Sequence, residues 1–144
     1  MKKNLFSIIV ILLVFIGVDS FAQNKKVKRA EFNNLTKSGS YTEYVAKMGN
    51  VLKIGDTLQI GVPTNFERYV YLTQNDGYLR AEQINKKIII KNINVSGDAK
   101  KGFDVFFTMK GLGATPVFVK YEDALQTKEI ILLNDTQKRT EELL

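Results

Sequence analysis

Residues 86–110 read KKIIIKNINVSGDAKKGFDVFFTMK, and this stretch decides the fold class. Lys86–Val95 and Lys100–Lys110 are rich in Ile, Val and Phe, which favour β-strands. Ser96–Ala99 between them contains Gly and Asp and has the length of a four-residue hairpin turn. The stretch therefore predicts a β-hairpin within a β-rich domain.

The register predicted for this hairpin places Val95 opposite Lys100. Lys91 then lies opposite Asp104, so that opposite charges meet on one face of the sheet. The other face collects apolar side chains and is the expected core face: Ile88, Ile90, Phe103, Val105 and Phe107. A shift of one residue would mix the two sets.

Period-two alternation predicts further strands on both sides of the hairpin. They are expected from Gly55 to Val62, from Phe66 to Thr73 and from Pro116 to Tyr121. In the strand Phe66–Thr73, Val70 and Leu72 are expected to face the core, and Tyr69 and Tyr71 to face outward.

Five short antiparallel strands predict a mainly β domain built as a small barrel. An SH3-like barrel is the expected type, with an OB-like barrel or a sandwich as alternatives. Before the strands, Ser40 and Glu43 have the spacing of a helix capping box, and apolar residues recur at helical spacing after Tyr41. We therefore expect a short N-terminal helix over Tyr41–Met48.

Residues 1–22 have the features of a secretory signal peptide: a basic start, an apolar run over Leu5–Val18, and a cleavage site between Ala22 and Gln23. The apolar run is shorter than the roughly 20 residues that span a bilayer, so removal is expected rather than retention as an anchor. The mature chain then divides into a basic flexible leader (23–39), a single β-rich domain (40–133) and a polar C-terminal tail with some helical character (134–144).

The chain has no Cys, which excludes disulfides and the attachment of a lipid to a cysteine after export. We expect a soluble periplasmic or secreted protein, without a stable membrane anchor, that is not a lipoprotein. The full chain has 21 basic and 15 acidic side chains, and removal of residues 1–22 leaves 19 and 14, a charge of +5. This charge favours a protein or an anionic envelope polymer as partner, and export argues against nucleic acid. The oligomeric state is left open.

Catalytic and metal-binding signals are few, because His is absent as well as Cys. Triads with a His base are excluded, and so are the preferred ligands of zinc and copper. We expect no catalytic residue, no metal site and no cofactor. Carboxylate chemistry is the remaining route, and Glu122-Asp123 is the only adjacent acidic pair inside the predicted domain. A hydrolase acting on envelope glycan, with Glu122 as the acid, is therefore kept as an alternative function.

Aromatic and cationic side chains are expected on the outer faces of the predicted strands. A surface that combines rigid rings with cations is typical of binding sites. The candidate binding residues are Tyr69, Tyr71, Phe106, Phe118, Lys91 and Lys120. The sequence thus favours an exported binding or interaction module. A structural accessory subunit, whose aromatic face is buried by a partner chain, is a further alternative function. The structural alternative is that the helix or the C-terminal segment of the same chain covers this face.

Three stretches resemble small exported proteins of unknown function that are common in Bacteroidetes: FAQ at 21–23, IGDTLQIG at 54–61 and YEDALQTKEI at 121–130. The resemblance covers roughly residues 54–130 and implies a barrel that opens with the second stretch and closes with the third. It also implies an O-glycosylation sequon at Asp56-Thr57-Leu58, with Thr57 as the modified residue. Lys128 stands where the closing segment is expected to carry Gly.

Overall fold

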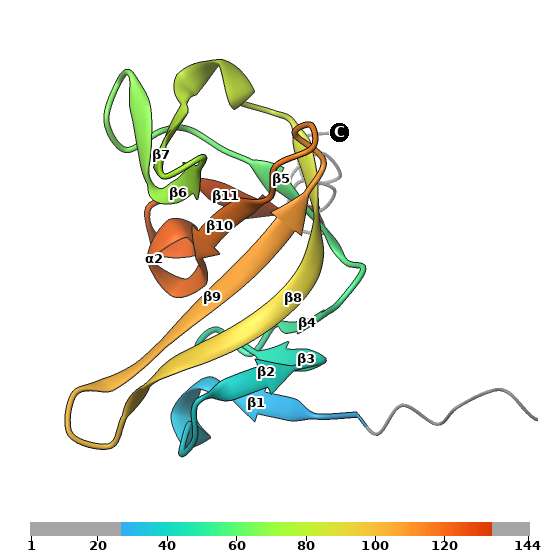
Figure 1. The fold of residues 1–144 in the computed structure, drawn as a ribbon, viewed down its shortest axis with the longest axis vertical. Helices are drawn as coiled ribbons and strands as arrows, with labels where there is room; N and C mark the ends of the chain where they lie inside the picture. The colour runs from blue at the N-terminus through green and yellow to red at the C-terminus, as the bar shows by residue number, and fades with distance from the viewer. Residues whose placement is uncertain (1–26, 134–144) are drawn as a thin grey trace, which may run out of the picture.

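The structure is a computed structural model that describes residues 27–133 and is mainly β (Figure 1). The signal peptide, its cleavage site at Ala22 and Gln23, the start of the leader and the C-terminal tail lie outside these residues. The strands are β1 (Arg29–Glu31), β2 (Gly39–Tyr41), β3 (Glu43–Val45), β4 (Val51–Lys53), β5 (Thr57–Ile60), β6 (Arg68–Gln74), β7 (Gly77–Arg80), β8 (Lys87–Asp98), β9 (Gly102–Lys110), β10 (Val117–Lys120) and β11 (Ile130–Leu132). The helical elements are the 3-10 turns η1 (Phe32–Asn34) and η2 (Ala81–Gln83) and the helix α2 (Tyr121–Gln126).

Eight strands form one antiparallel sheet that curls into a half-barrel. The strand order is β11-β5-β8-β9-β10-β6-β7, with β2 added to the far end of β8. The long β8–β9 hairpin is its central element, and its tip projects beyond the rest of the molecule (Figure 1). The mainly β prediction is confirmed, whereas the sheet has more strands than the five expected. The SH3-like, OB-like or sandwich type stays a prediction.

The predicted hairpin register is wrong. Val95 pairs with Val105 rather than with Lys100, and Asp104 pairs with Ser96 rather than with Lys91. The turn lies further along the chain than expected, because the Asp98 side chain accepts hydrogen bonds from the amides of Lys100 and Lys101 at 2.8 and 2.9 Å. Ser96 and Gly97, expected in the turn, therefore belong to the strand.

A β-bulge between Ile90 and Asn92 then reverses which side chains of β8 face inward. Ile88 and Ile90 are buried before the bulge, and Ile93 and Val95 are buried after it. Without the bulge, the two pairs would point to opposite faces. The expected core positions on β9 are correct for Val105 and Phe107, and Phe103 packs against the edge of the core.

The predicted helix over Tyr41–Met48 is also wrong. Tyr41 is the last residue of β2, and β3 covers Glu43–Val45. β3 pairs in parallel with β1 and antiparallel with β4, which makes a separate three-stranded sheet. Glu43, expected to cap a helix, instead binds Arg29 at 2.9 Å and Lys53 at 3.2 Å. Tertiary pairing outweighs the local helical pattern here.

The N-terminal segment is part of this second sheet and not wholly a flexible leader. Ala30 in β1 is 3% exposed, and each residue of β1 pairs with one of β3. The structured domain therefore begins before residue 40, where the sequence placed its boundary.

Three aromatic rings at the centre of the core join the two sheets. Tyr44 of β3 meets Phe107 of β9 and Tyr121 of α2 edge-on, with ring centroids 6.0 and 5.8 Å apart. Phe107 and Tyr121 stack at 4.5 Å. Such pairs add about 0.5–1.5 kcal/mol beyond burial alone. The cluster fixes α2 over the open side of the half-barrel.

The Glu129 side chain connects the end of the sheet at β11 to β6. Glu129 is fully buried, and its carboxylate accepts hydrogen bonds from the amides of Val70 and Tyr71, both at 2.7 Å, and of Thr64 at 3.1 Å. β10 pairs with β6 only at Thr73 and Leu72 before the chain turns into α2. The carboxylate thus provides hydrogen-bond acceptors for the part of β6 that does not pair with β10.

Candidate functional site

The outer face of the main sheet has an exposed aromatic half on β9, β10, β6 and β7. Phe118 of β10 lies between Thr108 of β9 and Thr73 of β6, and Tyr78 of β7 lies opposite Thr73. Phe118 is 47% exposed and Tyr78 is 52% exposed. Neighbouring strands are about 4.8 Å apart, so the backbone positions that carry the two rings lie about 10 Å apart across the sheet.

Two of the predicted aromatic site residues lie on this face. Phe106 is opposite Lys120 and two residues from Thr108, so it lies diagonal to Phe118. Tyr71 lies in the irregular part of β6, is half-buried and packs against the core. The structure therefore brings Phe106 and Phe118 together.

Tyr69 does not belong to this face, contrary to the prediction. It is fully buried, and its hydroxyl donates a hydrogen bond to the carbonyl oxygen of Gly61 at 2.8 Å. Burial, together with the nearby Glu129, raises the pKa of Tyr69 to about 12. The alternation on β6 fails because the strand is irregular between Arg68 and Thr73, so that Tyr69 and Leu72 are both buried and Val70 is exposed.

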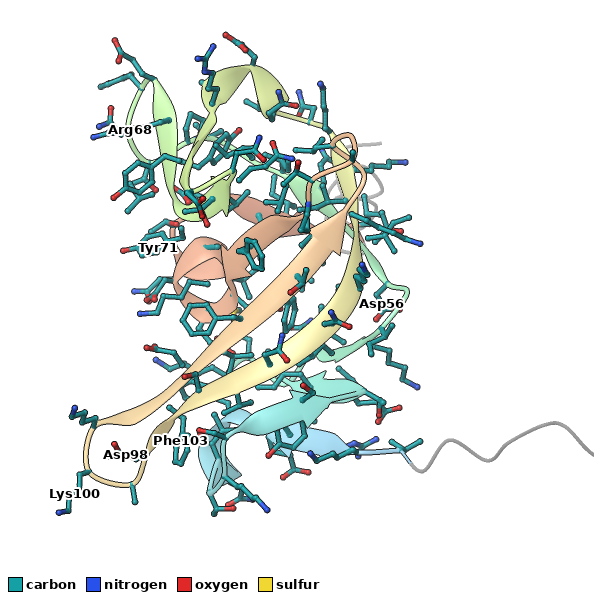
Figure 2. All side chains as sticks on the ribbon, in the orientation of Figure 1. Asp56, Arg68, Tyr71, Asp98, Lys100 and Phe103 are labelled. Atoms are coloured by element: carbon teal, nitrogen blue, oxygen red, sulfur yellow. The ribbon has the colours of Figure 1, made fainter. Side chains whose placement is uncertain are left out.

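Tyr78 is not among the predicted binding residues, because no strand was predicted between Thr73 and Lys86. Its ring is contacted by the Arg68 guanidinium, 4.7 Å from the ring centroid. Figure 2 shows Arg68 and Tyr71 beside β6 and β7, well away from Lys100 at the hairpin tip. The turn sequence Asn75-Asp76-Gly77 indicates a hairpin, and a hairpin at this point places Tyr78 across from Thr73.

The other half of the outer face is cationic. Lys110 of β9 lies opposite Ile89 of β8, and Lys87 is two residues from Ile89 on the same face. Lys91 is the extra residue of the bulge on the other side of Ile89, and all three lysines are exposed. None of the three forms an ion pair with another residue in 27–133. Of these, Lys91 was predicted, whereas Lys87 and Lys110 were missed because their proximity depends on the register.

We call this surface the aromatic-cationic face, and it consists of Tyr78, Phe106, Phe118, Lys87, Lys91 and Lys110. Neutral polar side chains separate its two halves. Asn92 and Asn94 of β8 lie opposite Thr108 and Phe106. Ser40 of β2 donates a hydrogen bond to the Asn94 side-chain oxygen at 2.8 Å.

Lys120, the remaining predicted cation, is held by two carboxylates. Its ammonium lies 2.9 Å from Asp123 and 3.1 Å from Asp104, and these hydrogen bonds raise the pKa of Lys120. Its charge is therefore compensated within the protein. Lys120 lies at the border between the outer face and a groove.

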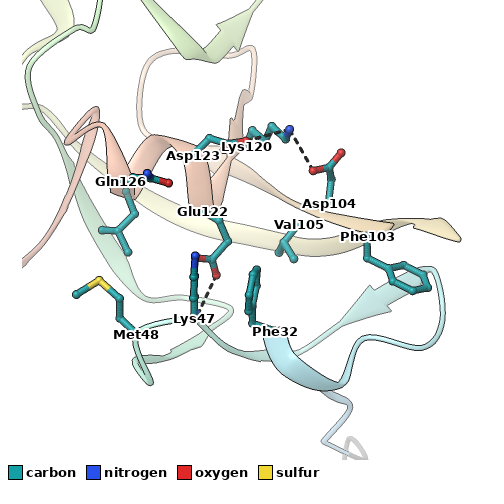
Figure 3. Close-up of a pocket in the computed structure, with 11 residues that line it drawn as sticks. Phe32, Lys47, Met48, Phe103, Asp104, Val105, Lys120, Glu122, Asp123 and Gln126 are labelled. Atoms are coloured by element: carbon teal, nitrogen blue, oxygen red, sulfur yellow. Dashed lines mark hydrogen bonds and ion pairs between the residues drawn. The ribbon is translucent and has the colours of Figure 1, made fainter. Parts of the chain in front are cut away.

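The groove lies between α2, the beginning of β9 and the segment after β3, and has a volume of about 470 Å³ (Figure 3). Its apolar walls come from Phe32, Met48, Phe103 and Leu125. Its charged groups are Lys47, Lys120, Asp104, Glu122 and Asp123.

Glu122, the acid of the alternative hydrolase function, lies in this groove. Its Oε1 accepts hydrogen bonds from the buried hydroxyl of Tyr44 and from the Lys47 amide at 3.1 Å. Burial and this hydrogen bond raise the pKa of Tyr44. The two other carboxylates of the groove both bind Lys120. Within residues 27–133, no group of three or more acidic residues is placed to hold a metal ion.

Thr57, the candidate O-glycosylation site, is the first residue of β5 and is half-buried. It pairs with Ile89 on β8, so its side chain points to the outer face beside the lysines. Modification of Thr57 stays a prediction.

Comparison with protein-family profiles, with curated proteins and with solved structures finds no match. In the described part of the chain, no helix has the length and apolar character needed to cross a membrane.

Proposed function

We propose that this chain is an exported binding module that holds an extended anionic polysaccharide on its aromatic-cationic face. The observation that carries the proposal is the division of one sheet face into exposed rings and lysines that have no acidic partner in residues 27–133. The mature chain, formed by cleavage between Ala22 and Gln23, would meet this polymer in the periplasm or outside the cell.

The lysine half supports an anionic ligand. Lys87 and Lys110 lie diagonally across the β8–β9 pair, within about 7–8 Å between their Cα atoms. Like charges this close repel each other, and an anion placed between them relieves that repulsion. Lys91, next to them at the bulge, adds a third ammonium group.

The aromatic half supports a sugar polymer. The apolar faces of pyranose rings pack against aromatic rings, and Phe118 and Tyr78 present such rings from strand positions about 10 Å apart, close to the length of a disaccharide. The side chains between them and the lysines are Thr, Asn and Ser, which exchange hydrogen bonds with hydroxyl groups. A large apolar side chain is absent from the described positions between the two halves, apart from the half-buried Ile89.

Binding to a defined polymer tests the proposal. Polygalacturonate serves as the carboxylated probe and dextran as the neutral one, with affinity gel electrophoresis as the readout. We expect retardation by polygalacturonate that weakens with salt, because exposed charges are screened over about 8–10 Å at physiological ionic strength. Phe118→Ala combined with Tyr78→Ala should weaken binding about tenfold or more, as the loss of aromatic anchors commonly does.

Two control variants separate the face from general surface effects. Phe66→Ala removes an aromatic ring that is 99% exposed but lies in the loop before β6, and it should leave retardation unchanged. Lys100→Gln with Lys101→Gln removes the same charge as Lys87→Gln with Lys110→Gln, but at the hairpin tip. Equal loss from the two lysine pairs would show that net charge, and not this face, holds the polymer.

The hydrolase alternative has a separate readout on the same probe. Release of reducing ends from polygalacturonate, abolished by Glu122→Gln, would replace the binding proposal with catalysis in the groove. The accessory-subunit alternative predicts a partner chain on the face and no retardation by either polymer.

A further inference from the structure

The groove coincides with a missing strand in the main sheet. β10 pairs with β9 from Val117↔Met109 to Lys120↔Phe106 and then turns into α2. β9 begins four residues earlier than this pairing, at Gly102. On the side where β10 lies, the residues from Gly102 to Val105 therefore have no strand beside them in the described chain. The groove occupies this place and is lined by Phe103, Asp104 and Val105 (Figure 3).

The main chain of Phe103 points into this gap. Its partner across the hairpin is Gly97. The N–H of Gly97 donates to the Ser38 hydroxyl at 3.0 Å, and its carbonyl accepts from the same hydroxyl at 2.7 Å, on the β2 side of β8. Gly97 and Phe103 therefore form a pair without mutual hydrogen bonds. The N–H and C=O of Phe103 are consequently directed away from β8, toward the groove.

β10 ends at Lys120, and its two neighbouring strands, β6 and β9, differ beyond that point. On the β6 flank, the Glu129 carboxylate binds the amides of Val70 and Tyr71. On the β9 flank, the amide of Phe103 has no comparable acceptor among the residues described. An exposed strand edge beside an apolar cleft is the arrangement that proteins use to bind extended peptides by strand addition.

The charges of the groove indicate which peptide fits. Three carboxylates face two ammonium groups, although the chain as a whole is basic. Lys120 is shared between Asp104 and Asp123, and Lys47 lies over the Phe32 ring, 5.8 Å from its centroid. The Asp104 side chain remains 55% exposed. A basic side chain is therefore the electrostatic complement of the groove.

We propose that the groove binds an extended peptide that pairs with β9 at Phe103 and alternates apolar with basic side chains. The apolar side chains would pack against Phe32, Met48 and Leu125, and a basic side chain would meet Asp104. This site and its ligand class are independent of the polysaccharide proposed for the aromatic-cationic face. Because the free edge is short, the affinity should be modest, with a Kd of about 10 μM to 1 mM.

The test uses two blocked pentapeptides, Val-Lys-Val-Lys-Val and Val-Glu-Val-Glu-Val, titrated into the isotopically labelled protein. We expect saturable shifts of the Phe103 and Val105 amide signals with the basic peptide, and slower hydrogen exchange of the Phe103 amide in the complex. A basic peptide in which proline replaces the central valine should bind at least about tenfold more weakly, because proline removes a donor that strand pairing uses. Asp104→Asn should reduce the preference for the basic over the acidic peptide.

Three results would overturn the proposal. One is the absence of saturable shifts up to about 1 mM peptide. Another is a set of shifts confined to residues outside the groove. The third is unchanged binding of the proline peptide, which would show that the peptide does not pair with β9. Because the Asp104 side chain is 55% exposed, its variant should keep the thermal midpoint of the wild type, and that midpoint is the control for folding.

Discussion

Replacement of Glu129 should destabilise the protein more than replacement of any exposed acidic residue. The carboxylate is fully buried and accepts three backbone hydrogen bonds, from Thr64, Val70 and Tyr71. Glu129→Ala leaves three amides without an acceptor in the protein. An unsatisfied buried donor costs about 1–3 kcal/mol, and water entering the cavity offsets part of the sum. We expect a loss of about 3–5 kcal/mol in the free energy of unfolding.

Glu129→Gln gives an intermediate and more diagnostic result. The amide oxygen can still accept from Val70 and Thr64, which share Oε1 in the wild type. The amide nitrogen, however, would face the Tyr71 N–H, so that two donors meet. We expect a loss of about 1–3 kcal/mol.

Urea unfolding followed by circular dichroism measures both variants against the wild type. Glu82→Ala, at an exposed position in η2, is the control and should stay within about 0.5 kcal/mol of the wild type. If Glu129→Ala also stays within that range, the carboxylate does not connect β11 to β6 in solution. Equal losses for Gln and Ala would instead refute the assignment of the hydrogen bonds.

Three further substitutions test local features of the same fold. Lys128 has φ = 62°, just after α2, and Lys128→Gly should raise stability by about 1 kcal/mol in thermal unfolding, whereas Lys128→Ala should give no such gain. A Cβ on Gly61 would lie 2.0 Å from the Lys128 carbonyl oxygen, so Gly61→Ala should cost about 2 kcal/mol or more, and a neutral effect would contradict this close approach. Hydrogen bonds from Arg29, and to a smaller extent from Lys53, lower the pKa of Glu43. The ionised Glu43 therefore adds to the free energy of unfolding above the ordinary pKa of about 4.3, and this addition is lost as the pH falls through the lowered pKa. Glu43→Gln should therefore flatten the acid limb of the stability–pH curve, and an unchanged limb would argue against the ion pair.

The sequence predicted what depends on local alternation. Val105 and Phe107 face the core and Phe106 faces outward, because a regular strand alternates with a period of two. Phe118 on β10 follows the same rule. These positions needed no knowledge of which strands are neighbours.

The features that were predicted wrongly depend on contacts between distant segments. Tyr69 is buried because β6 is irregular where it meets the Glu129 carboxylate, about 60 residues later in the chain. Residues 41–48 do not form the predicted helix, because β3 pairs with β1 and β4. The bulge at Lys91 likewise exists only in the pairing of β8 with β9. None of these has a signal within its own segment.

The candidate site could be predicted only in part for the same reason. The sequence identified exposed aromatic residues and Lys91, but Lys87 and Lys110 become neighbours only through the observed register. The groove was not predicted, because it exists where β10 ends opposite Phe106 while β9 begins at Gly102. Such an offset between strands cannot be read from the alternation of either one.

The most direct test of the central claim is to map a carboxylated oligosaccharide onto the protein by amide chemical shifts. Titration with a short oligogalacturonate should move the signals of Thr108, Lys110 and Phe118 in a saturable way, and the shifts should diminish in the Lys87→Gln, Lys110→Gln variant. Shifts confined to the groove, or shifts that persist unchanged in that variant, would contradict a binding site on the aromatic-cationic face.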